Sequence, residues 1–135
     1  MTKILIIGGT AEAKNLHFRL QEKKLFTILS YAGLTESIDK EVKNIRVGGF
    51  GGATGMSAFV KDEGITHILD ASHPFSKNIT VNSLLAAQLA KIEYLGFERP
   101  KWQRQKGDKW KLVSDMNKAI KLIDETDRVF VTIGS

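Results

Sequence analysis

The stretch Lys3-Ile4-Leu5-Ile6-Ile7-Gly8-Gly9-Thr10-Ala11-Glu12-Ala13 decides the fold. It begins with a short run that is almost continuously apolar, as expected of a β-strand covered on both faces. Two glycines follow directly, and beyond them the apolar spacing changes to the helical period. The stretch therefore predicts a strand, a tight glycine turn and a helix, the unit from which parallel α/β sheets are built.

The rest of the chain repeats this alternation, which predicts an α/β fold: a Rossmann-like parallel sheet with helices on both faces. The predicted strands span residues 3–7, 26–30, 44–47, 67–70, 93–97 and 128–133. The predicted helices are marked by Ala13, Leu16 and Leu20; by Met56, Phe59 and Val60; by Val81, Leu84, Leu85 and Leu89; and by Met116, Ile120 and Ile123. Gly64 is expected to end the second helix at its C′ position.

Length and composition favour one compact domain over residues 1–135 of a cytoplasmic protein. The chain has no cysteine, which excludes disulfides, thiolate metal sites and a cysteine nucleophile. No apolar run approaches the roughly 20 residues that cross a bilayer, so no membrane partner is expected. The net charge of +5 fits either a solvated lysine surface or an anionic ligand. Nucleic acid is disfavoured because the basic residues are scattered, and the oligomeric state stays open.

Ligands of open parallel sheets bind beyond the carboxyl ends of the strands. After the first strand, Gly8, Gly9, Thr10 and Glu12 belong to a degenerate Gly-x-Gly-x-x-Gly motif, with Ala13 at the third glycine position. Such a turn lets a pyrophosphate approach a helix N-terminus, although a plain strand-to-helix turn is the alternative. Thr10 is expected to contact a phosphate or to cap the helix.

The ends of the second and third strands also suggest a cofactor site. Ser30 ends the second strand, and no acid follows until Glu36, which permits the 2′-phosphate of NADPH. Five of the chain's 12 glycines fall at positions 48, 49, 51, 52 and 55. A glycine-rich loop predicts close approach of a ligand, and Phe50 within it is either a lid or a core residue. The candidate residues here are Ser30, Arg46, Gly48, Gly49, Phe50, Gly51 and Gly52.

The fourth and fifth strands end on candidate substrate residues. His73 precedes a proline and is expected to project from a loop, either as a proton donor or as a hydrogen-bonded loop histidine. Asp70 ends the fourth strand and is expected to cap this loop. The polar segment 98–108 is a possible linker or ligand loop whose cations and tryptophan suit a flat anionic ligand. The candidates are Ser72, His73, Pro74, Phe75, Arg99, Lys101 and Trp102.

Five motifs in this order resemble the precorrin-6A reductase family. They are Gly8-Gly9-Thr10-x-Glu12-Ala13, Ser30-x-Ala32-Gly33, Arg46-x-Gly48-Gly49-Phe50-Gly51-Gly52, Asp70-Ala71-Ser72-His73-Pro74-Phe75 and Glu98-Arg99-Pro100-x-Trp102. The resemblance implies NADPH-dependent reduction of a double bond in the precorrin-6A macrocycle, or in its cobalt form, during cobalamin biosynthesis. It also implies that the chain is the N-terminal half of a two-domain enzyme whose partner is a tetrapyrrole substrate.

One departure from the family concerns cofactor preference. Members usually continue Ser-x-Ala-Gly with an arginine, which suits the 2′-phosphate, whereas this chain has Leu34. Arg46, Lys40 and Lys43 are the cations that could substitute. The alternative function is an NADP-binding module or sensor without catalysis, because a fold does not fix a function. The Tyr-x-x-x-Lys pair of short-chain reductases is absent, which disfavours that class of oxidoreductase.

Overall fold

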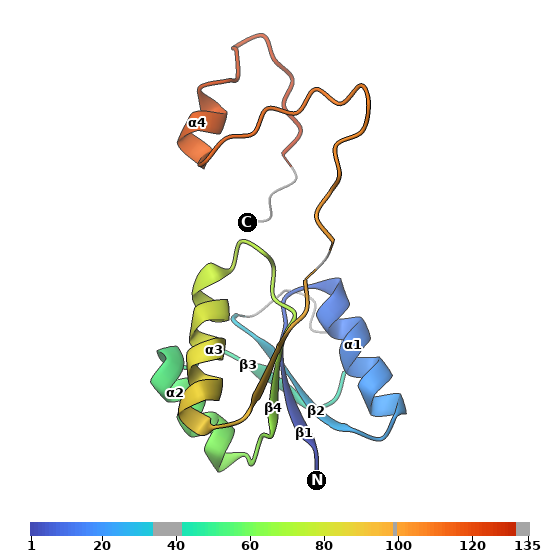
Figure 1. Cartoon of the computed structure of the whole chain (residues 1–135), viewed down its shortest axis with the longest axis vertical. Helices are drawn as coiled ribbons and strands as arrows, with labels where there is room; N and C mark the ends of the chain where they lie inside the picture. The colour runs from blue at the N-terminus through green and yellow to red at the C-terminus, as the bar shows by residue number, and fades with distance from the viewer. Residues whose placement is uncertain (34–41, 99, 132–135) are drawn as a thin grey trace. The chain divides into compact units, whose positions relative to one another are not determined.

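The computed structural model describes residues 1–33, 42–98 and 100–131. The chain separates into two compact units, Met1–Arg99 and Pro100–Ser135, and Figure 1 labels their helices and all the strands except the last. The boundary falls inside the 98–108 segment that the sequence suggests as a linker. That residues 1–135 act as a single cofactor-binding domain stays a prediction.

The first unit is built on a five-stranded parallel sheet, so the predicted fold class is confirmed. Its strand order is β3-β2-β1-β4-β5, with β1 at the centre. The sequence places these strands correctly, with ends that differ by at most one residue. The strands are β1 (Lys3–Ile7), β2 (Phe26–Tyr31), β3 (Ile45–Val47), β4 (His67–Asp70) and β5 (Glu93–Gly96).

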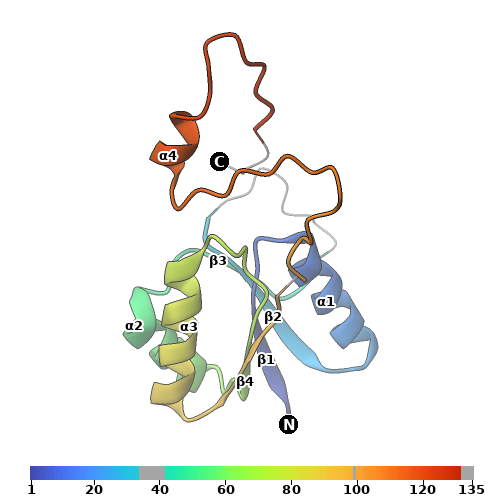
Figure 2. The same cartoon turned by 45° about the horizontal axis from the view of Figure 1, so that its top comes forward.

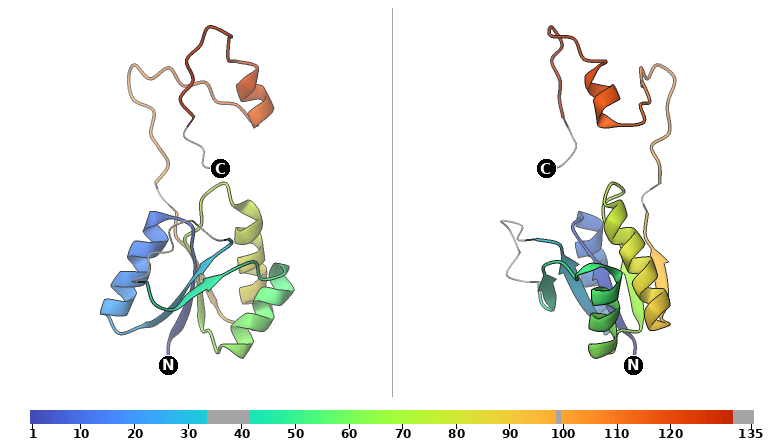
Figure 3. Two further views of the ribbon diagram at one scale, coloured as in Figure 1. Left: turned by 180° about the vertical axis from the view of Figure 1, so that it is seen from behind. Right: turned by 90° about the vertical axis from the view of Figure 1, so that its left-hand side faces the viewer.

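Helices cover both faces of this sheet, as Figure 3 shows from two further directions. Helix α1 (Ala11–Glu22) lies on one face, and α2 (Gly52–Asp62) and α3 (Lys77–Ala90) lie on the other. The central strand alternates accordingly: Ile4 and Ile6 belong to the core on the α1 side, and Leu5 and Ile7 to the core beneath α2 and α3. Gly64 follows the end of α2 with a φ of +65°, consistent with its predicted C′ position.

Helix α3 exists as predicted, but the apolar residues that mark it do not face the core. Val81, Leu84, Leu85 and Leu89 are 43–55% exposed. The buried side consists of Ser83, Ala86 and Ala87, and α3 packs extensively against α2. Small side chains let two helices approach closely, so packing selects them over the leucines.

The second unit has little regular structure among its described residues. Helix α4 (Met116–Ile120) is short, and Asp115 caps it by accepting a hydrogen bond of 2.9 Å from the Lys118 amide. The predicted strand over 128–133 is wrong for residues 128–131, which form no strand, and 132–133 lie outside the described residues. No described neighbour offers this segment a strand ladder, and a strand needs one.

Apolar side chains of the second unit stay exposed. None of its described residues is buried. No described helix of either unit is long and apolar enough to cross a membrane. The exposed apolar residues are Trp102, Trp110, Leu112, Val113, Met116, Ile120, Leu122, Ile123, Val129, Phe130 and Val131.

Candidate functional site

A pocket of about 230 Å³ lies in the first unit at the carboxyl ends of the strands. Beside β1 the order of the sheet reverses, because β2 lies on one side of it and β4 on the other. Such a switch point is where open α/β sheets bind ligands. Figure 2 shows that the chain leaves β1 and β4 at the same edge of the sheet. The lining residues are Ile7, Gly8, Gly9, Ser30, Tyr31, Ala32, Gly33, Gly48, Gly49, Phe50, Ser72, His73, Ser76 and Ile79.

The turn after β1 contains two glycines for different reasons. The Gly8 amide donates to the Ser30 carbonyl over 2.8 Å, and a Cβ on Gly8 would lie only 2.8 Å from the same oxygen. Gly9 has a φ of +104°, which side chains rarely adopt. The first glycine therefore lets β1 approach β2 closely, and the second lets the chain turn along the pocket.

Thr10 connects the start of α1 to the loop after β4. Its hydroxyl accepts a hydrogen bond of 3.1 Å from the Ala13 amide, as expected of an N-cap, and donates one of 2.7 Å to the Ala71 carbonyl. The predicted capping role is present in the structure. Because both bonds are internal and Thr10 does not line the pocket, the hydroxyl fixes the position of two loops.

The loop after β3 is held by Arg46. Its guanidinium donates to the carbonyl oxygens of Gly48 and Gly49, the latter over 2.9 Å, and lies 3.7 Å from the centre of the Phe50 ring. Burial lowers the pKa of Arg46 from its ordinary value. Phe50 contacts Phe59 edge-on and packs against the core beneath α2, so it is both a core residue and a pocket residue.

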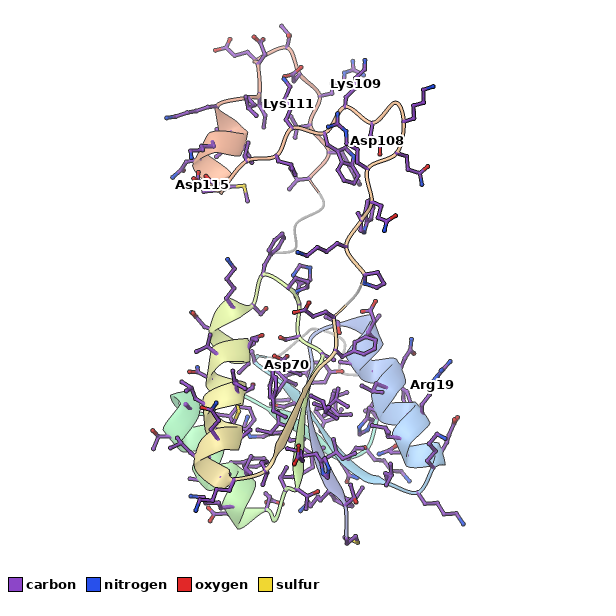
Figure 4. All side chains as sticks on the ribbon, viewed as in Figure 1. Arg19, Asp70, Asp108, Lys109, Lys111 and Asp115 are labelled. Carbon is purple, nitrogen blue, oxygen red and sulfur yellow. The ribbon has the colours of Figure 1, made fainter. Side chains whose placement is uncertain are left out.

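The loop after β4 is anchored by the buried Asp70, which Figure 4 labels near the end of its strand. One carboxylate oxygen accepts a hydrogen bond from the Ser72 amide and the other from the Tyr94 hydroxyl, both over 3.0 Å. Burial and the Asp70 charge raise the pKa of Tyr94 to about 12. The predicted loop-capping role of Asp70 is present in the structure, whereas nothing in the sequence pattern indicates its bond to Tyr94 on β5.

His73 projects from this loop as an exposed side chain and lines the pocket. Its Nδ1 accepts a hydrogen bond of 3.2 Å from the Phe75 amide, and the two rings lie 5.1 Å apart. Ser72 and Ser76 lie beside it in the lining. No described residue forms a hydrogen bond with Nε2, which can therefore face a ligand.

The structure brings part of the predicted site together. The residues that line the pocket are Gly8, Gly9, Ser30, Gly48, Gly49, Phe50, Ser72 and His73. Those described in the first unit but outside the lining are Thr10, Glu12, Arg46, Gly51, Gly52, Pro74 and Phe75. Lys101 and Trp102 belong to the second unit, and Arg99, Leu34 and Lys40 lie outside the described residues.

Several lining residues were not among the predicted site residues. Tyr31, Ala32 and Gly33 directly follow Ser30 in the Ser30-x-Ala32-Gly33 motif, so their position at a strand end is a usable signal. Ser76 and Ile79 lie at the start of α3. The sequence places a helix near here but does not show that its first turn faces the pocket.

A buried histidine outside the pocket contacts the segment that leads into β3. His17 of α1 is fully buried; Nδ1 lies 2.9 Å from the Thr27 hydroxyl and Nε2 lies 3.0 Å from the Lys43 carbonyl. Burial lowers the pKa of His17, and its bond to Lys43 opposes that shift. A neutral ring that donates from Nε2 and accepts at Nδ1 satisfies both partners.

Comparison with known proteins gives a consistent result over the whole chain. The family described as precorrin-6x reductase CbiJ/CobK matches residues 3–135. A precorrin-6A reductase from Rhodobacter capsulatus is 36% identical and covers 99% of this chain and 54% of its own length. One from a Sinorhizobium species is 40% identical and covers 98% of this chain and 51% of its own length.

A solved structure agrees with these sequences. The structure titled CobK precorrin-6A reductase aligns with a TM-score of 0.87 and 34% identity, over 93% of this chain and 50% of that chain. The chain thus spans about half the length of the relatives that it matches.

Proposed function

The chain belongs to the precorrin-6x reductase CbiJ/CobK family, and from this premise we propose that it forms the NADPH-binding part of a reductase. The substrate class is the precorrin-6A macrocycle, with or without cobalt, and the pathway is cobalamin biosynthesis. The relatives named precorrin-6A reductase support this activity. Because the chain spans about half their length, we expect residues 1–135 alone to bind the cofactor but to turn over the substrate poorly.

The observation that carries the proposal is a bare backbone surface around the pocket. Gly9, Gly33 and Gly49 all line it. At each of them, a Cβ would meet no described atom within 4 Å. Gly9 also has its positive φ as a reason. At Gly33 and Gly49, where φ is not positive, side chains would fit in the ligand-free protein, so their absence leaves room for a ligand that approaches the backbone closely. The loops that cradle a dinucleotide have this property.

Different loops of the first unit would bind different parts of the cofactor. The turn at Gly8 and Gly9 directs the pyrophosphate to the positive end of the α1 dipole. The ends of β2 and β3 flank the nucleotide half, and the loop with Ser72 and His73 flanks the nicotinamide half. The pocket of about 230 Å³ is smaller than the roughly 300–1,000 Å³ typical of ligand sites. The rest of the dinucleotide would lie along the open edge.

His73 is the candidate for proton transfer. Bound NADPH supplies a hydride for the macrocycle, and the neighbouring carbon must then gain a proton. With Nδ1 engaged by the Phe75 amide, Nε2 is the atom that would donate this proton or hold a substrate carboxylate. Pro74 and Phe75 shape the same loop, while Arg99, Lys101 and Trp102 are proposed to bind the carboxylates and conjugated face of the macrocycle.

A preference for NADPH over NADH is part of the proposal. The end of β2 offers no carboxylate through Gly33, and Ser30 and Tyr31 line the pocket there. A carboxylate at this place would bind the ribose 2′-hydroxyl of NADH and repel a 2′-phosphate. Nothing in this lining therefore opposes NADPH.

The first test is a titration of the chain with NADPH and NADH, followed by cofactor fluorescence. We expect saturable binding that is tighter for NADPH. Thr10→Asp should weaken it, since charge-assisted bonds are worth roughly 1.5–3 kcal/mol each and this substitution sets a negative charge against the pyrophosphate. Absence of binding to either cofactor would refute the proposed function.

The alternative is a module that binds NADP without catalysis, and the half-length match is the observation that favours it. Reduction of precorrin-6A by the chain distinguishes the two. Binding without turnover, with turnover restored by adding the remaining half of a relative, would support a cofactor-binding part of a larger enzyme. If the chain binds the cofactor but the added half does not restore turnover, the result would support the module.

A further inference from the structure

Arg46 is oriented toward its own loop. It lies on β3, two residues before the glycine run, and its two terminal nitrogens donate to the carbonyl oxygens of Gly48 and Gly49. Only a guanidinium offers donors in such a fixed fork. The Gly48 amide donates in turn to the Tyr31 carbonyl over 2.9 Å, which ties the loop to the end of β2.

Aromatic packing holds the same loop from a second side. The Arg46 guanidinium lies 3.7 Å from the centre of the Phe50 ring and 5.0 Å from that of Phe59. These two rings contact each other edge-on, with centres 5.4 Å apart. A Cβ on Gly55 would lie 1.8 Å from the Phe50 carbonyl oxygen, so α2 starts directly against the loop.

The positions of this run require glycine for different structural reasons. Gly48, Gly51 and Gly52 have φ values of +109°, +78° and +78°, and Gly55 avoids a collision. Gly49 has neither reason: its φ is outside the positive range and a Cβ there would meet no described atom. It lines the pocket, so the ligand remains as the cause of its missing side chain.

We propose that Arg46 is a positioning residue, which holds Gly49 as a bare surface against the nucleotide half of the cofactor and does not bind the 2′-phosphate. This inference rests on the proposed function. It assigns Arg46 a role outside the pocket lining, in agreement with its absence from that lining. Selectivity for NADPH then comes from other groups at the end of β2.

The test compares Arg46→Lys with the matched control Arg19→Lys. Lysine keeps the charge but cannot hold two carbonyls with a fork. Arg19 is exposed in the last turn of α1 and points away from the sheet (Figure 4). In the ligand-free chain, Arg46→Lys should speed hydrogen exchange of the Gly48 amide by about tenfold, and Arg19→Lys should leave it unchanged. Unchanged exchange in Arg46→Lys would show that no clamp exists.

Cofactor affinity tests the second half of the proposal. Arg46→Lys should raise the Kd values for NADPH and NADH by a similar factor, about tenfold, so that their ratio is kept. A loss of affinity for NADPH alone would show that Arg46 binds the 2′-phosphate and would overturn the proposal. If the wild-type chain binds neither cofactor, both the proposed function and the binding role of the clamp are wrong, while the exchange result still decides whether the clamp exists.

Gly49→Ala provides a variant that should not unfold. Its thermal midpoint should equal that of the wild type, because a Cβ has space, while the Kd values for both cofactors rise. Unchanged Kd values with an unchanged midpoint would refute the bare-surface role of Gly49. A lowered midpoint would contradict the space that the structure leaves there.

Discussion

The two units of the chain differ in what surrounds their apolar side chains. In the first, Leu5, Ile6 and Ile68 are completely buried within two cores, one on each face of the sheet. In the second, no described apolar side chain is buried, and Trp102, Leu112 and Phe130 are 86–92% exposed. Both stretches contain comparable apolar residue types, so composition alone does not decide which of them forms a core.

Topology supplies the difference. The first unit pairs each strand with a neighbour and covers the sheet with helices that bury its side chains. The second has one described helix of 5 residues and no described strand. Burial of apolar area is the dominant favourable term in folding, so we expect the first unit to carry the cooperative stability of the chain.

Truncation of a core side chain should have the largest effect on stability. Ile68→Ala should lower the free energy of unfolding by about 2–5 kcal/mol, because the side chain is completely buried. Leu112→Ala in the second unit should change it by less than about 0.5 kcal/mol. Chemical denaturation followed by circular dichroism measures both. Equal losses would show that the second unit contributes to the same core.

A collision on the loop after β3 should have the next largest effect. Gly55→Ala places a Cβ 1.8 Å from the Phe50 carbonyl, and overpacking of this kind costs about 3 kcal/mol. Gly107→Ala in the second unit is the control: it has a positive φ, yet no described atom lies near its Cβ position. The control should leave the midpoint of the main thermal transition unchanged. A shift as large as that of Gly55→Ala would show that the two units unfold together.

The two helix caps make a finer comparison. Thr10→Val removes the cap of α1 and the bond to Ala71, and should cost about 1 kcal/mol, while Thr10→Ser should restore most of it. Asp115→Ala removes the cap of α4 and should not shift the cooperative transition. Thermal unfolding measures all three variants, and equal shifts from both caps would contradict the separation of the units.

The smallest expected effect is a pH dependence below pH 6.5 that comes from a buried histidine of the first unit. The folded-state pKa of His17 lies below its ordinary value of 6.5, so the unfolded chain binds more protons between the two values. Stability from this residue is therefore complete above pH 6.5 and is lost as the pH falls toward the folded pKa. His17→Gln should flatten this part of the stability profile; an identical profile in the variant would assign the dependence to other groups.

The sequence predicts the sheet because periodicity is a local property. The apolar pattern predicts both ends of β1 and of β4 correctly. Helix α3 shows the limit of this approach: periodicity identifies its leucines, but the partner helix selects the opposite side with Ser83, Ala86 and Ala87. Which side is buried depends on the neighbouring helix, and that information is not local.

The site shows the same limit. Glycines after β1 and β3 pointed to loops that the structure brings to one pocket. The distant partners of Asp70 and His17 could not be predicted, because Tyr94 and the Lys43 carbonyl lie 24 and 26 residues away along the chain. Such hydrogen bonds follow from the finished sheet and leave no periodic signal.

The separation of the units also divides the chain optically. Both tryptophans, Trp102 and Trp110, lie in the second unit, and both tyrosines, Tyr31 and Tyr94, lie in the first. Tryptophan emission excited at the red edge of its absorption band therefore originates only in the second unit. Tyr31 lines the pocket, so tyrosine absorbance is the intrinsic signal located where a cofactor would bind. The chain thus carries one chromophore type for each unit, with no label added.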